Sequence, residues 1–183
     1  MFAVQLSASA ELRSLELRHA REFAAHMDRA REHIRPWVGP SFLSDDLGGA
    51  IATLARYADE TARDAARIFG IWDHEVLVGG AMFVEFSPAY GTCGLGCWLE
   101  PDAEGRGLVT AACSALLEWA FVVRGIHRAE WRCREDNLRS ASVARRLGMT
   151  YEGTLREAWK VGDTFYNKQV FSILASELTP AQP

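Results

Sequence analysis

The chain has 183 residues, of which 49% are hydrophobic and 24% are charged. This length and composition suit one globular domain, and they exclude an intrinsically disordered chain and a disulfide-stabilised mini-protein. The formal net charge of −4 argues against extensive coating of nucleic acid or acidic membrane, and it leaves room for a local basic patch.

The sequence predicts no membrane-spanning segment and no secretory signal. The two longest apolar runs, residues 76–84 and 119–123, are much shorter than the ~18–20 residues that a spanning helix needs. Residues 1–12 lack a basic segment followed by a long apolar one. We therefore expect a cytoplasmic protein that makes no direct contact with nucleic acid or membrane.

The first half of the chain alternates between strand and helix patterns. Apolar spacing and turn residues first predict a short strand (residues 14–18), a helix (20–32), a loop (35–40) and a second helix (45–63). A hairpin (67–72 with 76–86) and a further strand (94–100) follow. Asp45 is the predicted N-cap of the second helix, and Asp73-His74-Glu75 is the predicted turn of the hairpin.

The second half continues in the same way. The pattern predicts a helix (residues 108–119), a half-buried strand (128–133) and a short helix (137–148). Two further strands (149–155 and 165–174) follow. Asn137 is the predicted N-cap of the short helix, and Gly148 fits its C-terminal stop. Strands that alternate with helices and hairpins indicate an α/β (α+β) fold with a mixed sheet. Because repeats and linkers are absent, we expect a single domain over residues 1–183.

Positive charge is concentrated in the second half. Residues 106–146 contain eight arginines and four acidic residues. This excess suits a small polyanionic ligand. The alternative, that these arginines are spread over solvated faces, stays open on composition alone.

The cysteines and histidines do not follow a metal-binding pattern. Cys93 and Cys97 are four residues apart in a predicted strand, and no second Cys/His pair follows them. We interpret the cysteines as buried free thiols. His19, His26 and His33 are seven residues apart, roughly 10 Å along a helix, which is too far to share a metal ion. We expect ordinary helix-face histidines and no metal site.

Two strand-to-helix junctions carry the chemical signal. In the first, a strand ends, the turn Glu104-Gly105-Arg106-Gly107 follows, and a helix starts at once. Glycines allow the backbone to approach a ligand closely, and a helix start offers unpaired N–H groups and the positive end of a dipole. Such a turn favours phosphate, although the segment lacks both G-x-G-x-x-G and a following Lys-Ser/Thr.

The second junction leads from a strand into the short helix, through Asp136-Asn137-Leu138-Arg139-Ser140, and ends at Leu147-Gly148-Met149. By itself this segment favours an ordinary helix cap, with Asn137 at the N-cap and Ser140 in the first turn.

Together, in this order, the two junctions resemble the GNAT acetyltransferases, specifically the RimJ/RimL-like branch that acetylates protein N-termini. Arg35-Pro36-Trp37 resembles that branch's signature after the first helix, residues 104–109 its pyrophosphate loop, and residues 136–149 its later motif. The resemblance covers about residues 12–176. It implies a GNAT fold, with a mixed, mostly antiparallel sheet whose central parallel strands splay apart to hold acetyl-coenzyme A, and no metal.

The resemblance also implies site residues. Backbone groups of Trp98 and Leu99 would lie beside the pantetheine arm, the turn would hold the diphosphate, and Arg145 or Arg146 would reach a phosphate. The implied donor-binding residues are Trp98, Leu99, Glu104, Gly105, Arg106, Gly107, Leu108, Val109, Asn137, Ser140 and Arg145.

The implied chemistry is direct attack of an amine on the thioester. The N–H of Leu99 would stabilise the oxyanion, and Ser140 would give a proton to the leaving thiolate. The RimJ/RimL-like branch has a glutamate where this chain has Trp159, whose indole cannot accept a proton from the amine. Glu157 lies two residues earlier, on the same face if the strand is regular, and is the predicted base through water. Glu85 and Glu100 are the alternatives.

The pyrophosphate loop also departs from the usual pattern. Glu104 stands where Gln or Arg is usual, and a carboxylate beside a diphosphate is unfavourable unless it turns to solvent or pairs with a neighbour such as Arg106. Val109 stands where Gly or Ala is usual.

We therefore predict an acetyl-coenzyme A-dependent N-acetyltransferase that acts on a protein or peptide N-terminus and works as a monomer or homodimer. A small-molecule amine is an alternative acceptor. A non-catalytic acyl-coenzyme A-binding regulator is an alternative from another functional class.

Overall fold

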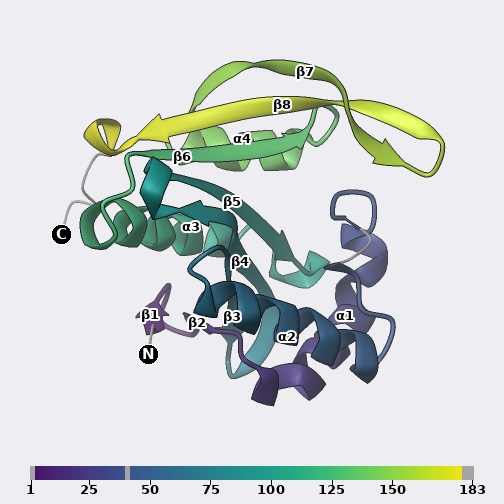
Figure 1. Cartoon of the computed structure of the whole chain (residues 1–183). Coiled ribbons are helices and arrows are strands. Elements are labelled where there is room, and N and C mark those ends of the chain that lie inside the picture. The colour runs from purple at the N-terminus through teal and green to yellow at the C-terminus, as the bar shows by residue number, and fades with distance from the viewer. Residues whose placement is uncertain (1–2, 40–41, 179–183) are drawn as a thin grey trace.

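One eight-stranded sheet organises the molecule (Figure 1). The structure, a computed structural model, describes residues 3–39 and 42–178. The strand order is β1-β2-β3-β4-β5-β6-β8-β7, and every neighbouring pair in it is antiparallel except β5 with β6. The predicted fold class, a mixed and mostly antiparallel sheet flanked by helices, is confirmed.

The elements have the following bounds. The strands are β1 (Ala3–Gln5), β2 (Ala10–Ser14), β3 (Arg67–Asp73), β4 (Val76–Ser87), β5 (Thr92–Leu99), β6 (Arg128–Arg134), β7 (Thr150–Val161) and β8 (Thr164–Leu174). The helices are α1 (Ala20–Ile34), α2 (Leu47–Ala62), α3 (Leu108–Glu118) and α4 (Leu138–Arg146). A π-helical turn, Trp119–Val123, extends α3, and short 3-10 turns occur at Leu17–His19, Pro88–Tyr90, Pro101–Ala103 and Ala175–Glu177.

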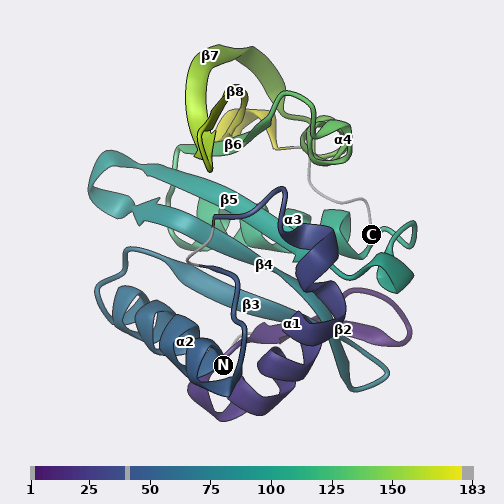
Figure 2. The ribbon, with the colours of Figure 1, turned by 90° about the vertical axis from the view of Figure 1, so that its right-hand side faces the viewer.

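Helices cover both faces of the central strands, so these strands are apolar on both sides (Figure 2). Phe83 and Leu95 belong to a core with residues of α3 and α4. Met82 and Trp98, on the opposite face, belong to a second core with residues of α1 and α2. Because successive strand residues point to opposite faces, the two cores alternate along each strand.

The parallel pair β5–β6 separates after a short contact. Its register runs only from Thr92 with Arg128 to Leu95 with Trp131. Beyond that point β5 stays paired with β4 as far as Leu99, and β6 stays paired with β8 as far as Arg134. The β6–β8–β7 layer therefore diverges from the rest of the sheet beyond this contact (Figure 1).

The N-terminal strand differs from its prediction. Residues 14–18 are not a strand, because β2 ends at Ser14 and Leu17–His19 forms a 3-10 turn. The position of β2 is set by its pairing with β3, which runs from Ala10 with Asp73 to Ser14 with Phe69. Local alternation cannot report such a pairing.

The other predicted elements are present, with shifted ends. The N-cap of α2 is Asp46, whose carboxylate accepts the Gly49 N–H, and not Asp45. Strand β7 is longer than predicted because the hairpin continues to Val161 opposite Thr164. The predicted loop over residues 35–40 begins after α1, and its last residue, Pro40, lies outside the described residues. In the part of the chain that is described, no helix is long and apolar enough to cross a membrane.

His26 joins α1 to β5 in the second core. Its side chain is fully buried, and its Nε2 accepts the indole N–H of Trp98 at 2.9 Å. Burial lowers the pKa of His26 to about 3, and the nearby Arg29 guanidinium acts in the same direction. The imidazole is therefore neutral in the folded protein at neutral pH.

Protonation of His26 should oppose folding in acid. The unfolded chain takes up a proton near pH 6.5 that the folded protein excludes until about pH 3, so stability falls as the pH drops through this window. From pH 7 to pH 4, the free energy of unfolding should fall more in the wild type than in His26→Gln, by about 2–3 kcal/mol. Urea denaturation at each pH measures both curves, and parallel curves would contradict this assignment.

Candidate functional site

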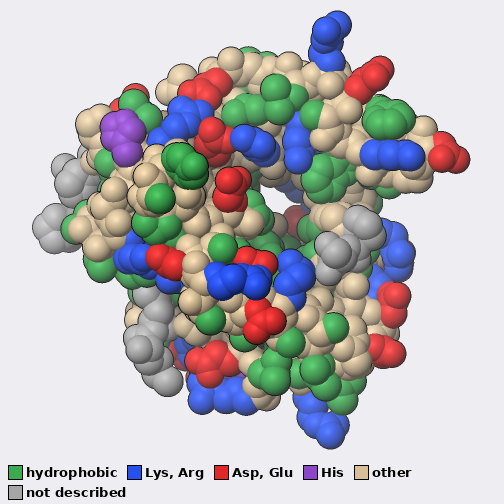
Figure 3. All heavy atoms as spheres, viewed as in Figure 1, with side chains coloured by type: hydrophobic (Ala, Val, Ile, Leu, Met, Phe, Trp, Pro, Cys, Tyr) green, Lys and Arg blue, Asp and Glu red, His purple; other side chains and the backbone are tan. Residues whose placement is uncertain are grey.

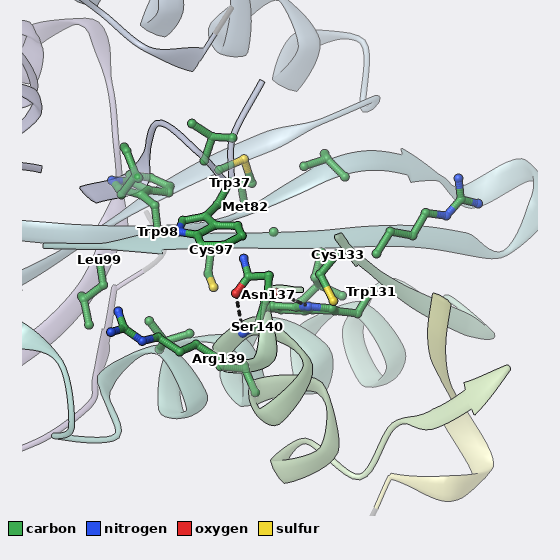
Figure 4. Close-up of a pocket in the computed structure, with 18 of the residues that line it drawn as sticks. Trp37, Met82, Cys97, Trp98, Leu99, Trp131, Cys133, Asn137, Arg139 and Ser140 are labelled. Atoms are coloured by element: carbon green, nitrogen blue, oxygen red, sulfur yellow. Dashed lines mark hydrogen bonds between the residues drawn. The ribbon is translucent and has the colours of Figure 1, made fainter. Parts of the chain in front are cut away.

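A cavity of about 1200 Å³ runs through the opening between β5 and β6. Its mouth is visible in Figure 3 between the β6–β8 layer and the rest of the molecule. It is lined by the turn after β5, by α4, by side chains of α2 and by the segment after α1. Figure 4 shows Cys97 and Cys133 on either side of it, with Asn137 and Ser140 below.

The glycine turn presents bare backbone to this cavity. Gly105 and Gly107 have φ of +76° and +75°, a backbone conformation that residues with a side chain rarely adopt. A Cβ at either position would meet open space. Gly107 is the N-cap of α3, and no side chain caps the helix there. The first N–H groups of α3 are thus available to a ligand, and the helix dipole favours an anion.

Glu104 is not paired with Arg106. Its Oε1 lies 2.7 Å from Nε2 of His33 on α1 and 3.1 Å from Nη1 of Arg139 on α4. Arg106 instead binds Asp73, and together with the Ser9 hydroxyl it lowers the pKa of that carboxyl to about 2. Glu104 is therefore paired, as one of the two expected arrangements requires, but its partners come from α1 and α4 and not from the loop.

The N-terminus of α4 is built as predicted. The Asn137 side chain accepts the N–H of Ser140 at 3.0 Å and so caps the helix. The Ser140 hydroxyl accepts the indole N–H of Trp131 at 2.9 Å. Since the oxygen is held as an acceptor by Trp131, the hydroxyl proton is free to be donated elsewhere, toward Cys133 or into the cavity.

The end of β5 directs a backbone donor into the opening. The N–H of Glu100 donates to Val78 on β4 at 2.9 Å. Backbone N–H groups of successive strand residues point to opposite edges, so the N–H of Leu99 points away from β4, toward the divergent β6. Trp98, one residue earlier, packs its ring against Phe42 at a centroid distance of 4.9 Å.

Most of the predicted donor-binding residues line the cavity, and three predicted site residues do not. The residues that line it are Trp98, Leu99, Glu104, Gly105, Gly107, Leu108, Val109, Asn137 and Ser140. Arg106 is turned to Asp73, and Arg145 lies over the ring of Phe171. Arg146 lines the cavity in place of Arg145, and its Nε donates to Thr110 at 3.3 Å.

Glu157 is the third residue outside the cavity lining. The register of β7 with β8 shifts between Leu155 and Trp159, and Glu157 itself has φ of +52°. The assumption of a regular strand is therefore wrong, so Glu157 and Trp159 do not share a face by simple alternation. Glu157 is exposed, whereas Trp159 lines the cavity.

The two alternative bases differ in position. Glu100 is buried and binds Arg29 at 2.9 Å, outside the cavity lining. Glu85 lines the cavity, and the strand registers place it in one row with Gly94 and Glu130 across β4, β5 and β6. Glu130 is bound by Arg128 and Arg132. Among the described residues no ion pair engages Glu85, so it is the more available carboxylate.

The four cysteines are free, and three of them are buried as predicted. Cys97 is half-buried because it lines the cavity opposite Cys133. Burial raises the pKa of Cys93 to about 12 and also raises that of Cys133, where the Ser140 hydroxyl partly offsets it. Within the described ranges, no three His, Cys, Asp or Glu side chains are grouped to hold a metal ion.

Comparisons with known proteins agree with this architecture. Residues 10–150 match the family described as "Acetyltransferase (GNAT) domain". Ribosomal-protein-serine acetyltransferase of Escherichia coli (strain K12) is 29% identical over 110 residues, which are 60% of this chain and 62% of that protein. Putative ribosomal N-acetyltransferase YdaF of Bacillus subtilis (strain 168) is 30% identical over 83 residues, which are 45% of each chain. The chain thus spans about half to six tenths of these relatives.

Solved structures share the fold over nearly the whole chain. A structure of RimL, the ribosomal L7/L12 alpha-N-protein acetyltransferase, in complex with coenzyme A has a TM-score of 0.87 at 20% identity, over 94% of this chain and 98% of that one. The microcin C7 self-immunity acetyltransferase MccE, in complex with acetyl-CoA and AMP, has a TM-score of 0.85 at 22% identity, over 93% and 95% of the two chains.

The Asn137 cap can be tested through stability alone. Asn137→Ala removes the acceptor of the Ser140 N–H and should lower the free energy of unfolding by about 1 kcal/mol. Asn137→Asp keeps an oxygen acceptor at the N-cap and should stay close to the wild type. Chemical denaturation measures both variants. If the alanine variant is as stable as the aspartate variant, the side chain does not act as a cap.

Proposed function

Because the chain belongs to the GNAT acetyltransferase family, we propose that it transfers the acetyl group of acetyl-coenzyme A to a primary amine. The observation that carries this proposal is the cavity through the β5–β6 opening, which connects an uncapped helix N-terminus with the carboxylate of Glu85. The helix N-terminus suits the diphosphate of the donor, and the carboxylate suits the amine of an acceptor. The amine attacks the thioester directly, without a covalent enzyme intermediate.

The residues present fit coenzyme A. Backbone N–H groups of residues 105–109, including that of Arg106, hold the diphosphate at the bare glycine turn. Arg146 lines the cavity and is assigned the phosphate contact in preference to Arg145. The free edge of β5 at Trp98 and Leu99 would lie along the pantetheine arm, and Asn137 and Ser140, which also line the cavity, would lie on its other side.

When bound, acetyl-coenzyme A supplies a thioester carbonyl and a thiolate leaving group. The N–H of Leu99 stabilises the developing oxyanion, an effect on the order of 3–4 kcal/mol for one well-placed donor. Ser140 donates its proton to the departing sulfur, since its oxygen is already an acceptor for Trp131. Glu85, which lines the cavity opposite Gly94, accepts the proton of the amine through water. Glu157 lies outside the cavity lining, which favours Glu85 over it for this role.

For the acceptor we favour a protein or peptide N-terminus. The support comes from the relatives, since one is a ribosomal-protein-serine acetyltransferase and another is named a putative ribosomal N-acetyltransferase. Such an acceptor would place the reaction in the cytoplasm. A small-molecule amine is the second candidate, because one structural neighbour is an immunity acetyltransferase with AMP bound and this cavity carries aromatic side chains at Trp37 and Trp159.

Coenzyme A binding at the glycine turn is the first test of the proposed function. Gly107→Val forces a branched side chain into a left-handed backbone position and blocks the approach of the diphosphate. Its dissociation constant for coenzyme A should rise by roughly tenfold or more, as for the loss of a hydrogen bond to a charged group. Isothermal titration calorimetry on folded variants measures this.

Gly162→Val is the matched control. Gly162 also has a positive φ and open space around it, but it lies in the turn between β7 and β8, outside the cavity lining. Its affinity for coenzyme A should equal that of the wild type. Equal affinities in both variants would reject the turn as the diphosphate site. Tight binding with no turnover of any peptide N-terminus or small amine would instead favour the non-catalytic regulator.

The proton transfers give a second test. Ser140→Ala should lower kcat by about 10²-fold while the affinity for coenzyme A stays nearly unchanged, because only the leaving thiolate loses its donor. Glu85→Gln should remove the fall in rate toward acid pH, since a base must be unprotonated to act. Glu157→Gln is the companion variant and should keep the wild-type profile. If instead Glu157→Gln loses the acidic limb and Glu85→Gln keeps it, the base is Glu157.

A further inference from the structure

A small side chamber of about 50 Å³ adjoins the main cavity between the segment after α1 and the β6–β8–β7 layer. Three cationic side chains, two indoles and one thiol line it, and no acidic side chain does: Trp37, Arg132, Cys133, Arg134, Trp159 and Lys168. Because all six also line the main cavity, a ligand in one space can extend into the other.

The three cationic side chains differ in whether a carboxylate pairs with them. Arg134 binds the carboxylate of Asp136, and Arg132 binds that of Glu130 at 2.6 Å. Lys168 has no carboxylate within ion-pair distance in the described part of the chain, and its Nζ lies 4.4 Å from the ring centroid of Trp159. Burial and the neighbouring Arg132 both lower the pKa of Lys168, as expected for a cation without a counter-charge.

Trp159 adds an unsatisfied donor beside this cation. Its indole N–H is buried and has no hydrogen-bond partner among the residues described. Buried polar groups in folded proteins are nearly always paired, because an unpaired donor loses its hydrogen bond to water without replacement. An ammonium group and a free N–H at one chamber are complementary to an oxygen anion.

The chamber lies next to the proposed transfer point. Cys133 lines both spaces, and burial raises the pKa of its thiol while the Ser140 hydroxyl and, more weakly, the Lys168 charge act in the opposite direction. On the sheet, Lys168 is opposite Arg134 on the face that also carries Glu130 and Glu85. An acceptor whose amine reaches the transfer point beside Ser140 can therefore place a second group near Lys168.

We propose that Lys168 and the indole N–H of Trp159 bind a carboxylate of the acceptor, so that the enzyme prefers amines with an acidic group close to the reacting nitrogen. This inference rests on the proposed function and names its acceptor class. For a peptide, the acidic group is the side chain of Asp or Glu at the first or second residue. For a free amino acid, it is a carboxylate of the same molecule.

The test compares matched peptides that differ only in charge, with Asp or Asn at the first or second position. In the wild type, kcat/KM should be about tenfold higher for the Asp peptide, the effect of one hydrogen bond to a charged group. Lys168→Gln should bring this ratio close to one, and Lys168→Glu should favour peptides with Lys instead. Free aspartate and asparagine, assayed in parallel, show whether the preferred acceptor is a peptide or an amino acid.

The chain offers a matched control, because it contains only two lysines, Lys160 and Lys168. Lys160 is exposed on β7, lies over Phe165 and is outside the lining of both spaces. Lys160→Gln should keep the wild-type Asp/Asn ratio. A ratio that falls equally in both variants would assign the preference to overall charge and overturn the proposal.

A binding measurement separates this inference from the proposed function. The acetylated products, acetyl-Ser-Asp-amide and acetyl-Ser-Asn-amide, are titrated calorimetrically into the protein with coenzyme A present. If the Asp product binds more tightly than the Asn product and Lys168→Gln abolishes the difference, the subsite is supported. This holds even if no amine is turned over, and in that case only the proposed function fails. Turnover with equal kcat/KM and equal product affinity for the Asp and Asn compounds overturns the subsite and leaves the proposed function intact.

Discussion

The separation of β5 from β6 is the constraint on which the site depends. Each strand is held along its outer edge, β5 by β4 up to Leu99 and β6 by β8 up to Arg134. Their shared register is short, so the two halves of the sheet diverge while each keeps its own hydrogen bonds. Trp131, buried at the last shared pair, lines the cavity, and its indole N–H donates to the Ser140 hydroxyl. The cavity therefore follows from the strand pairing, and it does not require backbone N–H or C=O groups to be buried in a closed core without hydrogen bonds.

Helix α1 holds the other side of the cavity. His26, Arg29 and His33 occur at spacings of three and four residues, so they share one face of the helix. They contact, in the same order, Trp98, Glu100 and Glu104. One face of α1 thus follows the segment that runs from the end of β5 to the glycine turn. Arg139 on α4 completes the set by binding Glu104 from the opposite side.

Charge is distributed differently at the two ends of the cavity. At the glycine turn, Glu104 is bound by the guanidinium of Arg139 and by a ring nitrogen of His33, and the helix N-terminus adds N–H groups that no side chain caps. On the far face, Glu85 and Glu130 flank Gly94, while Lys168 and Arg132 lie along the divergent layer. Gly94 has no side chain between the two carboxylates, and the side chain of Val84 lies beside it. This arrangement separates a region suited to an anionic donor from one that carries both signs of charge.

The sequence by itself determined the elements whose signals are local. The helices, the β3–β4 hairpin, the glycine turn before α3 and the Asn137 cap follow from apolar periodicity, glycine conformation and side-chain capping, which act within a few residues. Only the tertiary structure decided the partners of Glu104, the start of β2 and the availability of Glu85. It also placed Glu157 outside the cavity lining through a bulge in β7, and it brought Lys168 and Trp159 beside Arg132. These depend on strand register and on contacts between residues far apart in the chain, which local patterns do not encode.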